Sequence, residues 1–110
     1  MAEHLLSERM IRVGHPEWRI REDVSWTSQT GRIVALELSN AGASPVILDG
    51  SAAAIWQILN DLGSAAEPTI SQEVIARFHA NRKDVERPLA DFLARLEAAR
   101  LIELEVRFTP

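Results

Sequence analysis

The stretch VILDGSAAAIWQIL, residues 46–59, constrains the fold most, because its apolar pattern changes period at a single glycine. Val46, Ile47 and Leu48 form a short run of branched and apolar residues, which is typical of a β-strand. From Ser51 onward the apolar residues follow the spacing of a helix instead. The sequence therefore predicts a short strand that passes directly into an apolar helix.

Two further strands are predicted before this point. In residues 23–28 apolar and polar side chains alternate, so that each kind lies on its own face of a strand. Gly31 tolerates a positive φ and supplies a tight turn. A second alternating strand follows over residues 32–38. Together with the strand at residues 46–48, these segments predict a small antiparallel meander.

Helical periodicity replaces alternation in the second half of the chain. Apolar residues recur there at the i, i+3, i+4, i+7 spacing of an amphipathic helix. The predicted helices cover residues 51–62, 69–81 and 84–100. The predicted fold class is accordingly α+β and winged-helix-like, with an N-terminal three-stranded antiparallel sheet followed by three helices.

Residues with known preferences set the predicted helix starts. Asp49 or Ser51 is expected to cap the first helix. Thr69 is expected to cap the second, because Gln72 follows three residues later and completes a capping-box pattern. Pro88 has no backbone N–H, so it is expected in the first turn of the third helix.

Alternation returns at the end of the chain. In Ile102–Phe108 four apolar residues alternate with Glu103, Glu105 and Arg107, which predicts a C-terminal strand. Such a strand would close the remaining edge of the sheet, or it would pair with a neighbouring molecule and form a homodimer.

No combination of residue types in the sequence indicates an enzyme. The chain has no cysteine and no tyrosine, and its three histidines are dispersed, which argues against thiol chemistry and a metal centre. Its five glycines are isolated, so no phosphate-binding loop is predicted. We therefore expect a non-catalytic protein without cofactor or metal. No apolar run is long enough to span a bilayer, and the lack of cysteine fits a reducing compartment, so we expect a cytoplasmic location.

Binding of DNA by a winged helix-turn-helix regulator is the alternative function. The third predicted helix and its approach carry five basic residues: Arg82, Lys83, Arg87, Arg95 and Arg100. Four acidic residues are interleaved with them, however, and the whole chain has a net charge of −4. Phosphate contacts need cationic side chains, so this balance disfavours nucleic acid as a partner.

The third predicted strand offers a different kind of binding surface. As the last strand of a meander it has one edge whose N–H and C=O groups are unpaired beside the helices. An extended peptide can add to such an edge as a further strand. The pattern therefore predicts Val46, Ile47 and Leu48 as peptide contacts, with a purely structural role in the core as the alternative.

Three motifs carry a resemblance to a known family. LDGSAAAIW, residues 48–56, is similar to a Leu-Asn-x-x-Ala-x-x-Ile-Trp stretch, although Asp49 replaces the usual Asn. Residues 69–74 are similar to a Thr-x-x-x-Ile/Val cap, with Val74 one position later than the motif has it. Residues 87–96 keep the Phe-Leu-x-x-Leu part of an Asp-x-x-x-Phe-Leu-x-x-Leu pattern, but Asp91 stands next to Phe92. Over about residues 18–103 the chain thus resembles the family of pyrroloquinoline quinone biosynthesis protein D. These small domains are also called recognition elements of ribosomally synthesised and post-translationally modified peptides. Arg100 departs from the family, which often has glycine at that position.

The resemblance implies a peptide chaperone with no catalysis of its own. Such domains bind the leader segment of a ribosomally made precursor peptide and deliver it to a modifying enzyme or a leader protease. Lasso-peptide and quinone-cofactor pathways use similar domains. The leader is expected to lie beside the third strand and against the third helix. The expected contacts are Val46, Ile47, Leu48, Arg87, Ala90, Asp91 and Ala94.

The four helix positions have separate expected roles. Ala90 and Ala94, one turn apart, would leave room for a guest side chain. Arg87 and Asp91 would pair with charges of the leader or with each other. The expected organisation of the chain is an irregular segment at residues 1–17, the peptide-binding domain at residues 18–103 and a tail at residues 104–110.

Overall fold

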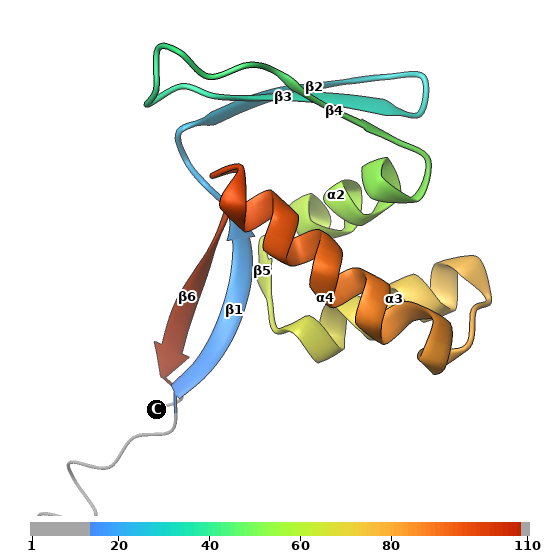
Figure 1. Cartoon of the computed structure of the whole chain (residues 1–110). Helices are drawn as coiled ribbons and strands as arrows, with labels where there is room; N and C mark the ends of the chain where they lie inside the picture. The colour runs from blue at the N-terminus through green and yellow to red at the C-terminus, as the bar shows by residue number, and fades with distance from the viewer. Residues whose placement is uncertain (1–13, 109–110) are drawn as a thin grey trace, which may run out of the picture.

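Two small antiparallel sheets and three helices form the part of the chain that the computed structural model describes, residues 14–108 (Figure 1). In chain order the elements are β1 (Gly14–Ile20), β2 (Val24–Gln29), β3 (Arg32–Glu37), β4 (Val46–Asp49), α2 (Ser51–Leu62), β5 (Ser64–Ala65), α3 (Glu67–Phe78), α4 (Arg82–Ala98) and β6 (Ile102–Phe108). One sheet has the order β2-β3-β4 and the other β5-β1-β6. The predicted α+β class is confirmed, and the second sheet is an addition to it.

The β2-β3-β4 sheet lies over the helices (Figure 1), and α2 is the helix that contacts β3 and β4. Ile33 of β3 lies opposite Leu48 of β4, and both side chains are buried. Trp56 of α2 is fully buried, and its ring meets that of Trp26 edge to face with the ring centres 5.9 Å apart. Aromatic pairs in this arrangement add to the stabilisation that burial already gives. The three strands begin and end within one residue of their predicted limits.

The β5-β1-β6 sheet is built by segments from the two ends of the described chain. β1 pairs with β6 along its whole length, from Gly14 opposite Phe108 to Ile20 opposite Ile102. Trp18 is buried at the base of this ribbon, whereas its far end extends beyond the helices (Figure 1). Residues 14–17 therefore open a strand, although the sequence predicted an irregular segment there. The remainder of that segment, residues 1–13, lies outside the described residues.

The predicted C-terminal strand exists as β6, but its position differs from the first expectation. It pairs with β1 and does not close an edge of the β2-β3-β4 sheet. The reason is that β1, which precedes β2 in the chain, lies outside the β2-β3-β4 sheet and has an edge free for β6 (Figure 1). Pairing with a neighbouring molecule stays a prediction.

Helix α2 has its predicted limits but not its predicted cap. Gly50 is the N-cap residue, with a φ of 59°, and no side chain caps the helix. The Asp49 carboxylate is occupied elsewhere, because it accepts a hydrogen bond of 2.8 Å from Arg32 Nε on the neighbouring strand. Glycine reaches this positive φ without the strain of a Cβ atom, which allows the abrupt turn from β4 into α2.

The other two helices start before their predicted first residues. Helix α3 begins at Glu67, so Thr69 lies inside its first turn, where Pro68 is tolerated because no N–H is needed. Helix α4 begins at Arg82, which places Pro88 in the helix interior and not in its first turn. Pro88 therefore cannot donate the helical hydrogen bond to the carbonyl of residue 84.

The backbone at the end of α4 shows why glycine suits the position that Arg100 occupies. This residue has a φ of 63°, in the left-handed region that favours glycine. The N–H of Leu101 donates to the carbonyl of Leu96 at 3.0 Å, which closes the end of the helix before β6 begins. The backbone thus makes the turn that glycine would ease, at a conformational cost of about 1 kcal/mol.

Candidate functional site

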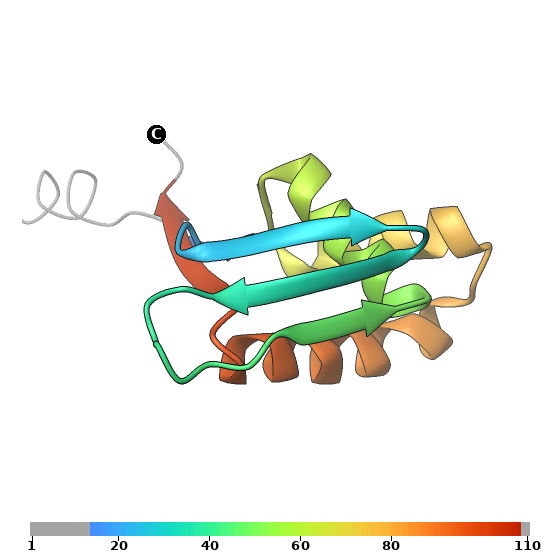
Figure 2. The ribbon, with the colours of Figure 1, turned by 90° about the horizontal axis from the view of Figure 1, so that it is seen from above.

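Strand β4 is an edge strand whose outer side lies next to helix α4. It is bonded to β3 on its other side, and no strand within residues 14–108 pairs with its outer edge. Seen from above, α4 runs beneath and alongside this edge (Figure 2). An extended peptide at the edge would therefore lie between β4 and α4.

The alternation of hydrogen bonds along the sheet determines which groups face this edge. The turn between β2 and β3 has two residues, Thr30 and Gly31, both with positive φ, so the flanking pair across it is hydrogen-bonded. Because bonding alternates, the backbone of Ile33 then faces β4 and pairs with Leu48. The N–H and C=O groups of Ile47, one residue away, consequently point to the outer edge.

The side chains of β4 divide between two faces. Leu48 is buried with 6% of its surface exposed, and Val46 on the same face is half-buried. Ile47 is 57% exposed on the outer face of the sheet, opposite Val34. The core role weighed for this strand therefore holds for Val46 and Leu48, whereas Ile47 is free to contact a guest with its backbone and its side chain.

An apolar cavity of about 220 Å³ lies just past the end of β4. It is lined by Ser51, Ala52 and Ile55 of α2, Val74 of α3, and Asp84, Val85, Pro88, Leu89 and Phe92 of α4. Small and apolar side chains dominate this lining, with one carboxylate and one hydroxyl among them. Such a cavity accepts an apolar side chain and gains free energy from removing it from water.

The predicted contact residues of α4 lie around the helix from this cavity. Phe92 lines the cavity, but none of Arg87, Ala90, Asp91 and Ala94 does. At 100° per residue, Ala90 and Ala94 are each about 160° around the helix from Phe92. Contact of these four residues with a guest stays a prediction. Pro88 and Phe92, an i, i+4 pair, lie on the cavity side, but their spacing alone does not distinguish that side from the rest of the apolar stripe.

The predicted pairing of Arg87 with Asp91 is not formed within residues 14–108. The ion pair that α4 carries instead joins Arg82 and Glu86 at 3.5 Å. Both Arg87 and Asp91 are exposed, so each is available to a charged partner.

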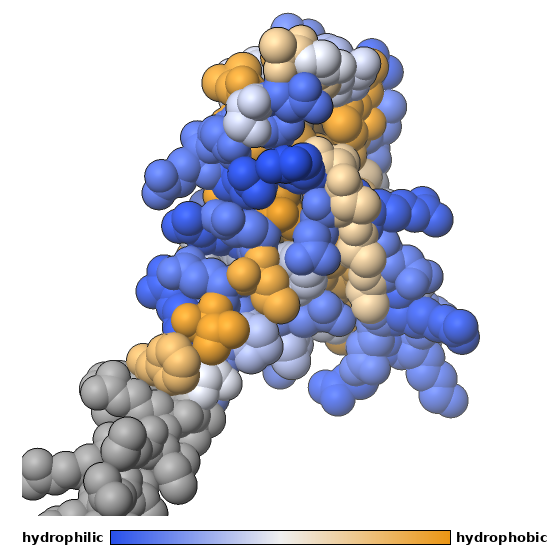
Figure 3. All heavy atoms as spheres, turned by 60° about the vertical axis from the view of Figure 1, so that its left-hand side comes forward, coloured by the Kyte–Doolittle hydropathy of each residue, from blue (hydrophilic) through white to orange (hydrophobic). Residues whose placement is uncertain are grey.

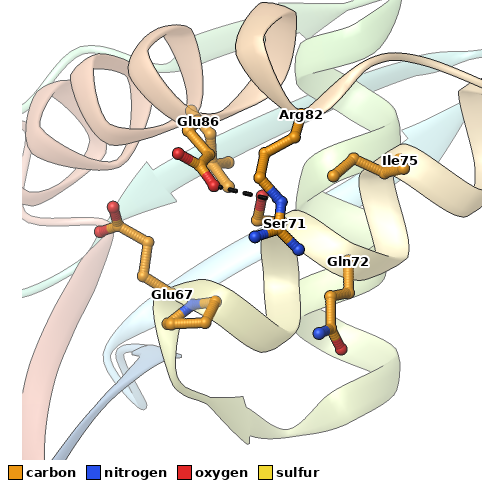
Figure 4. Close-up of a pocket in the computed structure, with 8 residues that line it drawn as sticks. Glu67, Ser71, Gln72, Ile75, Arg82 and Glu86 are labelled. Atoms are coloured by element: carbon orange, nitrogen blue, oxygen red, sulfur yellow. Dashed lines mark ion pairs between the residues drawn. The ribbon is translucent and has the colours of Figure 1, made fainter.

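A second hollow, of about 380 Å³, lies between α3 and α4 (Figure 4). Its lining is Glu67, Pro68, Ser71, Gln72, Ile75, Arg82, Glu86 and Leu89. Charged groups in it already have partners, since Arg82 pairs with Glu86 and the Glu67 carboxylate accepts a hydrogen bond of 3.3 Å from Trp18 Nε1. Its lining comes from α3 and α4 alone, whereas the smaller cavity is also lined by Ser51 and Ala52, which follow β4 in the chain, so we assign the candidate site to the smaller cavity.

Two ion pairs that shift the pKa of their members lie away from this site. Arg21 donates two hydrogen bonds to the Asp23 carboxylate, at 3.0 and 3.1 Å, and these lower the pKa of Asp23 below its usual value. Arg19 donates to Glu103 at 2.7 Å, which raises the pKa of Arg19. Both pairs fix the corner where β1 meets β2 and β6.

The described residues hold no group of three or more histidine, cysteine, aspartate or glutamate side chains placed to bind a metal ion. Within residues 14–108, no helix combines the length and the apolar character needed to cross a membrane.

Comparison with known proteins places these elements in a family. The family model of coenzyme PQQ synthesis protein D (PqqD) matches residues 38–102, which is more than half of the chain. The chain belongs to the PqqD family. The matched residues contain β4 and all three helices of the described chain, and hence every residue that lines the cavity. The family resemblance seen in the sequence is confirmed.

A solved structure matches the fold over most of its length. It is TbiB1 in complex with the TbiA(beta) leader peptide, with a TM-score of 0.68 and 27% sequence identity. The match covers 77% of this chain and 94% of that chain. Among curated protein sequences no match is found.

Proposed function

We propose that this PqqD-family protein binds the leader segment of a ribosomally synthesised precursor peptide and delivers it to a modifying enzyme or a leader protease. The leader adds as a strand to the outer edge of β4, and one of its apolar side chains enters the cavity between α2 and α4. The observation that carries the proposal is the unpaired edge of β4, after which the chain reaches the first lining residue of that cavity, Ser51, within two residues. The leader-peptide complex of TbiB1, a protein of similar fold, supports it.

Backbone and side chains contribute differently to such binding. The outward N–H and C=O groups of Ile47 pair with the guest backbone whatever its sequence, which gives affinity. The cavity selects, because only a guest with an apolar side chain at the right position fills it. The two parts together require an extended segment of a few residues with one apolar anchor.

The proposed role needs no catalytic group. The cavity is lined by Asp84 as its sole carboxylate and by Ser51 as its sole hydroxyl, and it contains no histidine. We propose a non-catalytic binding protein that acts in the cytoplasm, where precursor peptides are made. Its proposed partners are the leader, the enzyme that receives it and a second copy of the chain.

Fluorescence anisotropy tests the proposal. Labelled peptides that cover the leader segments of small precursor genes beside this gene are titrated with the protein, and a labelled random DNA duplex is titrated in parallel at physiological salt. Saturable binding of one leader supports the proposal. Salt-sensitive binding of the duplex without leader binding would instead establish the winged helix-turn-helix regulator.

A further inference from the structure

Strand β6 has a free outer edge of its own. In the order β5-β1-β6 it is the last strand, and no strand within residues 14–108 pairs with its far side. The N–H of Arg21 donates to the C=O of Leu101 at 3.1 Å, which fixes the alternation of bonds between β1 and β6. Glu105 consequently bonds to β1, and its neighbours Leu104 and Val106 point their backbone groups outward.

The same edge carries an exposed apolar row. Leu104, Val106 and Phe108 are 46%, 55% and 57% exposed, and the row continues from the buried Ile102 at its base. Hydrophobic side chains gather along this part of the surface, where they are drawn in orange (Figure 3). Gly14 opposite them leaves space for the row, because a Cβ there would approach Val106 Cγ1 to 2.7 Å. A long, exposed, apolar edge strand is a template for pairing with another chain.

We infer that β6 pairs with β6 of a second copy of this chain, antiparallel and around a two-fold axis at Val106. In this register Val106 lies opposite its counterpart, and Leu104 lies opposite Phe108. All of these residues point their backbone groups outward, so the hydrogen-bond pattern of the two edges matches. The two ribbons join into one six-stranded sheet with the strand order β5-β1-β6-β6-β1-β5.

The charged face of the ribbon selects this register. Within one chain Glu105 pairs with Arg19 and Arg107 pairs with Glu17, each at 3.5 Å. With the axis at Val106, Glu105 of each copy also faces Arg107 of the other, which adds two favourable cross-strand pairs. With the axis one residue earlier, Glu105 would face its own counterpart, and like charges directly opposite are destabilising. With the axis one residue later, the two Arg107 side chains would face each other. If the axis lay between two residues, a residue whose backbone groups point to the free edge would lie opposite one whose groups point to β1, and the two could not form a hydrogen-bonded pair.

The dimer is independent of the proposed leader site. The β4 edge belongs to the other sheet, so pairing along β6 leaves both β4 edges open. One strand pair and its apolar row bury less surface than a permanent dimer interface, so we expect a concentration-dependent dimer with micromolar affinity. A bivalent assembly would present two leader sites to one enzyme.

Sedimentation velocity over a range of micromolar concentrations tests the inference. The wild-type chain should pass from the mass of one chain to that of two, and Val106→Lys should raise the dissociation constant at least tenfold because two lysines would meet on the axis. Leu38→Lys is the matched control, since Leu38 is 60% exposed but lies just past the end of β3. A wild-type chain that stays monomeric at the highest concentration would overturn the inference, and so would equal loss in both variants.

Cysteine scanning tests the register, because the chain has no cysteine of its own. On mild oxidation Val106→Cys should form a disulfide-linked dimer, since the two sulfurs meet at the axis. Leu104→Cys should remain uncrosslinked alone and should crosslink when it is mixed with Phe108→Cys. Crosslinking of Leu104→Cys alone as fast as Val106→Cys would refute the register.

Discussion

Replacement of Ile47 by proline tests strand addition by removing one backbone N–H group at the outer edge of β4. The N–H of Ile47 points to the outer edge of β4, as the bonding alternation from the β2-β3 turn requires. Proline removes this donor and places its ring where a guest backbone would approach. Because the lost N–H makes no bond to β3, the sheet itself keeps all its hydrogen bonds.

The expected loss follows from one hydrogen bond. A hydrogen bond contributes about 0.5–1.5 kcal/mol net, and a guest carbonyl left without a donor costs about 1–3 kcal/mol. A loss of about 1–3 kcal/mol raises the dissociation constant about 5- to 150-fold. Ile47→Ala keeps the donor and changes only a side chain that is 57% exposed, so its effect should stay below that of proline.

Anisotropy titrations of the wild-type chain and both variants with the same labelled leader give the comparison, after circular dichroism has shown that each variant is folded. If folded Ile47→Pro binds the leader as tightly as the wild type, the leader does not pair with the outer edge of β4. That result would refute strand addition at β4 but would not test the β6 dimer, because the dimer interface lies in the other sheet.

Three further predictions concern the cavity, the core and the β1-β2 corner. Ala52→Phe should fill the cavity and weaken leader binding about tenfold or more without loss of thermal stability, whereas Ala54→Phe on α2, outside the cavity lining, should leave binding unchanged. Leu93→Ala, at a position with no exposed surface, should lower the free energy of unfolding by about 2–5 kcal/mol in urea titrations; a loss below 1 kcal/mol would contradict the packing of α4. Asp23 has a lowered pKa because of its hydrogen bonds from Arg21, so its contribution to stability is present above its unfolded pKa of about 4 and is lost as the pH falls through the lower folded value. Asp23→Asn should therefore be less stable than the wild type at neutral pH, and the urea midpoints of the two should converge as the pH falls below the folded pKa of Asp23. A difference that stays constant with pH would show that the pair with Arg21 does not titrate with folding.

Local periodicity was sufficient to predict the strands and the helix that bury one face. The strands β2, β3 and β4 and helix α2 follow from alternation and from helical spacing, because each places its apolar side chains on a single side. The last strand of the meander was also identifiable as an edge, since chain order alone leaves it without a following partner. The family motifs depend on these same positions, which is why the resemblance was visible in the sequence.

Strand β1 is an element that local sequence patterns did not predict. Residues 14–20, GHPEWRI, contain a glycine and a proline and lack regular alternation, so nothing local favours a strand. What makes this segment a strand is pairing with β6, which lies at the other end of the chain. Pro16 is accommodated because its position opposite Val106 calls for no hydrogen bond to β6.

The sequence by itself determined the α+β class, the β4 edge and the family, because these depend on spacing within short segments. Only the tertiary structure decided which side of α4 lines the cavity. The apolar stripe of a helix is wider than one residue, so its spacing does not fix the rotation of the helix against its neighbours. Packing against α2 and α3 turned Pro88 and Phe92 to the cavity and left Ala90 and Ala94 on another face, since a contact between distant elements depends on how they meet in space.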